Sequence, residues 1–148
     1  MTAALAAGVD VGRDYFDVAF APQGRAFRAP NTAGGVETIL ARLRRAGARK
    51  VVMESIGCFG ARLVRALADA GFEVGVVDPR RIKALRLAEG RRAKTDRLDA
   101  ELIARFALTM QDAARPVPSA QAFQIRALST RRRQVVEASL HERLPLRA

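Results

Sequence analysis

The hydrophobic pattern of this chain changes its period once, near residue 32, and that change limits the folds the chain can adopt. Before it, the segments "AAGVDVG" and "DYFDVAFAP" are rich in β-branched and aromatic residues, and they flank a tight turn at residues 12–14. Such segments predict two paired strands, and the run "RAFRA" at 25–29 predicts a third. After it, apolar residues recur three and four positions apart, which predicts an amphipathic helix that ends near Gly47. The chain therefore begins with an antiparallel meander and continues into a helix.

The next part of the chain alternates strand and helix. The apolar segments "KVVME" and "FEVGVVD" predict two buried strands, separated by a helix that ends at Gly71. Two further helices are predicted, at about 79–90 and 96–110. Because strands joined through a helix usually run parallel, this half of the chain predicts a parallel crossover.

Together these elements predict an α/β fold with a mixed five-stranded sheet. The rules of short connections and right-handed crossovers place the strands in the order 3-2-1-4-5, with helices on both faces. This is the plan of RNase H-like domains, and a flavodoxin-like or actin-like sheet can open with the same elements. Pro116 and Pro118 interrupt the chain before a last, loosely helical segment. We therefore expect one domain over residues 1–112 and a helical extension over 113–148.

The charge of the chain is strongly positive, and arginine carries most of it. There are 26 Lys and Arg residues against 15 Asp and Glu residues, a formal net charge of +11. A basic segment runs from position 80 to position 97, and its cations are Arg80, Arg81, Lys83, Arg86, Arg91, Arg92, Lys94 and Arg97. Because a guanidinium pairs with phosphate through two parallel hydrogen bonds, this segment predicts binding to nucleic acid. The alternative is that arginines encoded by a GC-rich genome cover solvated helix faces.

Cysteine usage and hydropathy exclude several classes of protein. A single Cys excludes a disulfide framework and a zinc site built on paired cysteines, and it predicts a reducing, cytoplasmic location. No apolar run approaches the roughly 18 residues of a membrane-spanning helix, and the N-terminus lacks the basic start of an export signal. We expect no membrane partner.

Two acidic residues fall near the ends of the first and fourth predicted strands. Asp10 interrupts the apolar run "GVDVG" on the strand face opposite its neighbours, and Glu54 closes "KVVME". These strands are neighbours in the order 3-2-1-4-5, so both acids can share one end of the sheet. An acid within a covered strand is unfavourable unless it is paired, hydrogen-bonded or bound to a metal. For Asp10, a structural bond to the backbone or to an arginine is the alternative to a metal.

Asp96 and Asp99 are three positions apart at the predicted start of a helix. They lie about 60° apart on the helix surface and can reach one point in front of its first turn. One interpretation is a capping box, with Asp96 as the N-cap and Asp99 three residues further on. The other is a metal site shared with Asp10 and Glu54, because four converging carboxylates need cations. Hard oxygen ligands without His or Cys suit Mg²⁺ or Mn²⁺, which two-metal enzymes use in phosphodiester transfer.

Three segments carry a resemblance to a known family. They are "GVDVGRDYFDVAF", "VVMESIGCFGARLVRALADAGFEVGVVDPRRIKAL" and "GRRAKTDRLDAELIARFA". They resemble the N-terminal domain of the DEDD transposases of bacterial insertion sequences, a group that includes Piv/MooV-type DNA invertases and bridge-RNA-guided recombinases. The resemblance implies a RuvC-like catalytic domain whose metal-binding acids are Asp10, Glu54, Asp96 and Asp99. It also implies DNA and a structured guide RNA as partners, and a homo-oligomer.

The resemblance also sets an expectation about length. Members of the family continue into a second domain that carries a nucleophilic Ser, whereas this chain stops at Ala148. We therefore expect an isolated RuvC-like domain of a transposase or site-specific recombinase, incomplete for strand exchange. The alternative function is a non-catalytic module that binds nucleic acid, or that regulates a full-length transposase by forming mixed oligomers.

Overall fold

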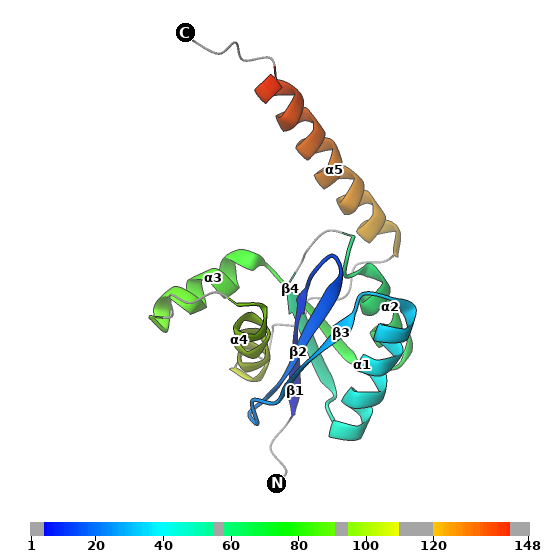
Figure 1. The fold of residues 1–148 in the computed structure, drawn as a ribbon, viewed down its shortest axis with the longest axis vertical. Helices are drawn as coiled ribbons and strands as arrows, with labels where there is room; N and C mark the ends of the chain where they lie inside the picture. The colour runs from blue at the N-terminus through cyan, green and yellow to red at the C-terminus, as the bar shows by residue number, and fades with distance from the viewer. Residues whose placement is uncertain (1–4, 55–57, 91–94, 110–119, 143–148) are drawn as a thin grey trace. The chain divides into compact units, whose positions relative to one another are not determined.

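The computed structural model describes residues 5–54, 58–90, 95–109 and 120–142. Its strands are β1 (Ala6–Val11), β2 (Tyr15–Ala21), β3 (Ala26–Pro30), β4 (Lys50–Glu54) and β5 (Glu73–Val77). They form one sheet in the order β3-β2-β1-β4-β5, which can be followed in Figure 1. The pairs β1–β2 and β2–β3 are antiparallel, whereas β1–β4 and β4–β5 are parallel. The predicted mixed sheet, its strand order and its RNase H-like plan are confirmed.

Helices cover both faces of this sheet, as predicted. They include α1 (Ala33–Ala46), α2 (Ala61–Asp69), α3 (Pro79–Ala88) and α4 (Asp96–Thr109). Figure 1 shows α1 and α2 on one side of the sheet and α3 and α4 on the other. A further helix, α5 (Ala120–Glu142), belongs to a second unit, because the chain divides into Met1–Val117 and Pro118–Ala148. The predicted boundary after residue 112 lies outside the described residues.

Local chemistry sets the ends of the helices in the first unit. The Thr32 hydroxyl accepts a backbone hydrogen bond at the start of α1, and Gly47, with a φ of 74°, ends that helix in the left-handed region. Asp78 caps α3 in the same way, and Pro79 occupies the first helical position. In the described part of the chain, no helix combines the length and the apolar character needed to cross a bilayer.

The helix α4 lies directly against β1, and a glycine makes this approach possible. A Cβ added at Gly8 would lie 2.2 Å from the backbone N of Ala104 and 2.4 Å from the carbonyl O of Ala100. A side-chain carbon cannot occupy these distances, so any other residue would force α4 away from the sheet. The helix that begins with Asp96 and carries Asp99 is therefore held close to β1.

Two groups of apolar residues bury the inner side of α4. The first joins α4 to β1, β4, β5 and α3, and its members are Ala6, Val52, Val77, Ile82, Leu102, Ile103, Phe106 and Ala107. The second consists of small residues that let α4 approach β2, namely Ala19, Ala21, Ala100 and Ala104. Burial of each large apolar side chain contributes about 1.5–3 kcal/mol, so the first group fixes α4 on the sheet.

Candidate active site

Asp10 and Glu54 lie on the same face of the sheet. Side chains alternate along a strand, and on β1 both Ala6 and Gly8 face α4. Asp10 is the next residue of β1 on that face. On β4, Val52 packs in the apolar group around α4, which places Glu54 on the α4 side as well.

The same two acids lie at one end of the sheet. The strands β1 and β4 are parallel, and Val9 pairs with Met53. One step further along both strands brings Asp10 level with Glu54, near the carboxyl ends. Neighbouring strands are about 4.8 Å apart, so these two predicted site residues are side by side. Both residues are half-buried.

Asp99 is buried, and its carboxylate is engaged by Arg86. The exposed fraction of Asp99 is 5%, and Arg86 of α3 donates from Nη2 to its Oδ1. The Arg86 side chain is itself only 18% exposed. Because both charges are largely removed from water, removal of either would leave the other buried and unpaired. A predicted phosphate-binding residue thus neutralises a predicted metal ligand.

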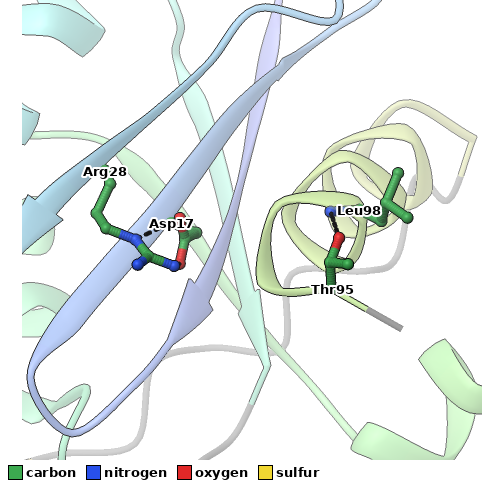
Figure 2. A network of polar contacts seen from close by, with 4 residues as sticks. All are labelled: Asp17, Arg28, Thr95 and Leu98. Carbon is green, nitrogen blue, oxygen red and sulfur yellow. Dashed lines mark hydrogen bonds and ion pairs between the residues drawn. The ribbon is translucent and has the colours of Figure 1, made fainter. Parts of the chain in front are cut away.

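The N-cap of α4 is Thr95. Its hydroxyl accepts a hydrogen bond of 3.2 Å from the Leu98 N–H, drawn in Figure 2, and its carbonyl accepts one of 2.9 Å from the Asp99 N–H. Asp96 is then the first helical residue, and Asp99 turns its side chain to Arg86. The capping-box interpretation, with Asp96 as the N-cap, is therefore wrong, because the Thr95 hydroxyl already accepts the capping hydrogen bond of the first turn. The side chain of Asp96 lies outside the described part of the structure.

Another acid, Asp17 of β2, lies opposite Asp10 and is not among the predicted site residues. The two are partners in the antiparallel register of β1 and β2. Asp17 is 9% exposed, and Arg28 of β3 binds both its oxygens, with Nε to Oδ1 at 3.0 Å and Nη2 to Oδ2 at 2.9 Å (Figure 2). Directly opposed carboxylates repel each other, and Arg28 offsets that repulsion. The signals that identify Asp17 are the alternation in "DYFDVAFA" and the tight turn at 12–14, which sets the register.

The predicted phosphate-binding residues differ in their surroundings. The helix α3 presents three exposed cations, Arg80, Arg81 and Lys83. Arg97 is exposed on α4 and donates through Nε to Glu101 at 3.2 Å. Arg86 is the one engaged by Asp99. Three of the predicted residues lie outside the described residues, namely Arg91, Arg92 and Lys94. Arg80, Arg81 and Lys83 thus form an exposed basic surface on α3, beside the helix that carries Asp99.

The acids of the candidate site offer only oxygen ligands. Among the side chains that the structure describes, no three His, Cys, Asp or Glu residues are grouped so that they could hold a metal. The side chain of Asp96 is not one of those described, and Asp99 is held by Arg86. Carboxylate oxygens are the hard ligands that Mg²⁺ and Mn²⁺ prefer, so the donor chemistry of Asp10 and Glu54 fits such an ion.

Known families and structures resemble the chain to different degrees. The model of a transposase family, the DEDD transposases of the IS110 type, matches residues 7–148. No curated protein matches the chain. Among solved structures, Thermus thermophilus RuvC in complex with a Holliday junction substrate is 19% identical, with a TM-score of 0.45 over 84% of this chain and 90% of that one. The fowlpox virus Holliday junction resolvase is 11% identical, with a TM-score of 0.44 over 70% of this chain and 93% of that one.

Proposed function

Because the chain belongs to the DEDD transposase family of the IS110 type, we propose that it acts on DNA phosphodiester bonds as a RuvC-like, metal-dependent recombinase domain. The proposed catalytic residues, which would bind Mg²⁺ or Mn²⁺, are Asp10, Glu54, Asp96 and Asp99. The observation that carries the proposal is the position of Asp10 and Glu54 on one face and one end of two neighbouring parallel strands. The close contact of α4 with β1 supports it, because that helix carries the other two acids.

Strand pairing holds the backbone of Asp10 and Glu54 in a fixed relation, which would limit the positions that their carboxylates can reach. A bound Mg²⁺ or Mn²⁺ would supply Lewis-acid stabilisation of the attacking and leaving oxygens. Asp17 lies opposite Asp10, and Arg28 holds both its oxygens. We therefore assign Asp17 a positioning role beside Asp10.

Arg86 sets a condition for cation binding at Asp99. Its guanidinium already satisfies that carboxylate, so a metal ion must displace it. Replacement of one cation by another gains little net free energy, and we expect weak binding of Mg²⁺ when no nucleic acid is present. A phosphate group brought to α3 would give Arg86 another acceptor and so favour metal binding.

The proposed partners are DNA and a structured guide RNA, bound through phosphate contacts. The exposed cations Arg80, Arg81 and Lys83 support this proposal. Phosphate contacts release counterions, so the affinity should fall as the salt concentration rises. The proposed setting is the cytoplasm.

A homo-oligomer is proposed through the helical extension, residues 113–148, with residues 1–112 as the catalytic part. On α5 the apolar residues Ile125, Leu128, Val135 and Val136 are between 49% and 69% exposed. Exposed apolar side chains gathered on one element are typical of interaction surfaces.

A matched pair of asparagine variants tests the proposed function. Asp10→Asn removes a proposed ligand, whereas Asp14→Asn changes an exposed acid in the turn after β1. We expect Mn²⁺ titrations, followed by electron paramagnetic resonance, to show affinity reduced roughly tenfold to 100-fold in Asp10→Asn and unchanged in Asp14→Asn. Cleavage of a branched DNA substrate should follow the same order.

Equal Mn²⁺ affinity in the two variants would contradict the proposed metal site. Retained DNA binding without metal-dependent cleavage would favour the non-catalytic module instead.

A further inference from the structure

A cavity of about 660 Å³ lies at the hairpin between β2 and β3, where α1 and α4 contribute residues from either side of the sheet. The side chains that characterise it are Phe20, Arg25, Phe27, Arg42, Arg45 and Arg97. Among the described residues that line the cavity, none is acidic. Four arginines therefore share a concave site without a carboxylate in its wall.

The arginines are brought together by tertiary structure. Arg42 and Arg45 are three positions apart on α1 and share one face of that helix. Arg25 comes from the turn before β3, and Arg97 from the first turn of α4. Only Arg97 belongs to the basic segment between positions 80 and 97, so the cavity is a second basic site with its own members.

Two contacts limit the freedom of the arginine side chains. The Arg42 guanidinium lies 4.4 Å from the centroid of the Phe27 ring, and that ring stacks on Phe20 with centroids 6.0 Å apart. Arg97 bonds Glu101 through Nε, the guanidinium nitrogen farthest from the tip of the side chain. Side chains that are ordered before binding lose less entropy when a ligand arrives.

We propose that this cavity binds the phosphates of a nucleic-acid strand. Arginine pairs with phosphate through two parallel hydrogen bonds, and the cavity volume falls within the range of ligand sites, larger than one phosphate requires. The formal net charge of +11 favours a polyanion as the ligand. The inference rests on the proposed function in taking nucleic acid as the partner. It adds a contact site at the edge strand β3. Of the four arginines of this site, only Arg97 belongs to the basic segment.

The competing partner at this place is an acidic peptide, because β3 is an edge strand and a peptide can extend such a strand. The number of arginines in the cavity and the overall charge favour a nucleic acid. The peptide is therefore included as a competing ligand in the test.

Two double variants that each remove two positive charges distinguish binding at the cavity from a general effect of net charge. Arg25→Gln/Arg45→Gln removes two exposed cavity arginines, and Arg44→Gln/Arg49→Gln removes two exposed arginines that do not line it. Binding is measured by fluorescence anisotropy in EDTA over a range of KCl concentrations, with a single-stranded RNA, a DNA of the same sequence and a duplex DNA. Circular dichroism checks that both variants are folded.

We expect the cavity variant to bind roughly tenfold more weakly, and its log–log salt slope on a single strand to be shallower by about 1.4, which is two phosphate contacts. The control variant should weaken binding less than about threefold. A larger loss on RNA than on DNA, or the reverse, would support the site and identify the strand it holds. Equal loss in the two variants would overturn the proposal.

An acidic peptide that competes with the strand, and that loses affinity in the cavity variant alone, would overturn it in favour of a protein partner. Because the assay contains EDTA, it does not depend on the metal site. The cavity can therefore stand even if metal-dependent cleavage is never observed.

Discussion

The first turn of α4 carries residues of two regions with opposite charge balance. In the candidate active site, two acids are matched by arginines from within the fold, Asp99 by Arg86 and Asp17 by Arg28. In the cavity at the β2–β3 hairpin, four arginines gather, and no acid is among the described lining residues. The comparison contrasts acids that arginines of the fold already pair with a group of arginines of which only Arg97 has a described carboxylate partner, Glu101, outside the cavity wall. Large effects on stability are expected in the first region and large effects on binding in the second.

The two regions are separated by the geometry of one helical turn. Arg97 and Asp99 are two positions apart, about 200° around the helix, so their side chains project to opposite sides. The Asp99 side chain is 6% exposed, whereas that of Arg97 is 70% exposed. Any change that moves α4 should therefore disturb both regions at once.

The largest expected effect comes from Gly8→Val, which should disrupt both regions together. An added Cβ would meet the backbone of α4 at 2.2 Å, and a backbone cannot rotate away as a side chain can. We expect a loss of about 5 kcal/mol or more in the free energy of unfolding, measured by urea denaturation, or no folded protein at all. Gly34→Ala is the control, since Gly34 has open space around it in α1, and it should stabilise the protein by about 0.5–1 kcal/mol. Wild-type stability in Gly8→Val would contradict the contact between α4 and β1.

The next effect concerns the more buried of the two ion pairs. Arg86→Leu should lower the free energy of unfolding by about 3 kcal/mol, because it leaves the carboxylate of Asp99 buried and unpaired. Arg80→Leu, an exposed change on the same helix, should alter stability by less than about 0.5 kcal/mol. The double variant Arg86→Leu/Asp99→Leu should recover most of the loss. If Arg86→Leu and Arg80→Leu were equally stable, the pair would not be part of the structural framework.

The sequence predicts the order of the strands and part of the candidate site. The remaining features depend on strand register and on contacts between helices. The change of period near residue 32 and the rules for crossovers predict the sheet order, and the strand ends predict Asp10 and Glu54. Strand registers follow less directly, so Asp17 is found only once the short turn is known to place it opposite Asp10.

Contacts between helices cannot be predicted from local sequence patterns. The pair between Arg86 and Asp99 depends on how α3 docks on α4, which is set by buried residues such as Ile82 and Phe106. The cavity depends on Arg25, Arg42, Arg45 and Arg97, which three separate elements bring together. A charge count over one segment therefore predicts a nucleic-acid partner, but it cannot show that Arg97 lies beside Arg25, Arg42 and Arg45.

A smaller effect is expected at the second ion pair, which is more exposed. The Arg28 side chain is 51% exposed and that of Asp17 only 12%, so solvent can replace part of what Arg28 provides. Arg28→Leu should lower the free energy of unfolding by about 1–2 kcal/mol, less than Arg86→Leu. Denaturation of the two variants under identical conditions checks the order. The reverse order would mean that repulsion between Asp10 and Asp17 outweighs burial in this region.

The smallest expected effect is the stabilisation of the native state by bound Mg²⁺, which competes with Arg86 for Asp99. At a free Mg²⁺ concentration of about ten times the dissociation constant, binding to the native state alone should stabilise the wild type by about 1.4 kcal/mol. Reaching that concentration should need more Mg²⁺ in the wild type than in Arg86→Leu, because in the wild type the cation competes with a guanidinium for Asp99. The thermal midpoint is measured against Mg²⁺ for both proteins and for Asp10→Asn, with KCl at the same ionic strength as the control for screening. Asp10→Asn should lose the response, and Arg86→Leu should respond at a lower Mg²⁺ concentration despite its lower starting stability. An equal response in all three proteins would assign the effect to ionic strength, and a weaker response in Arg86→Leu would mean that Arg86 holds Asp99 in position for the metal.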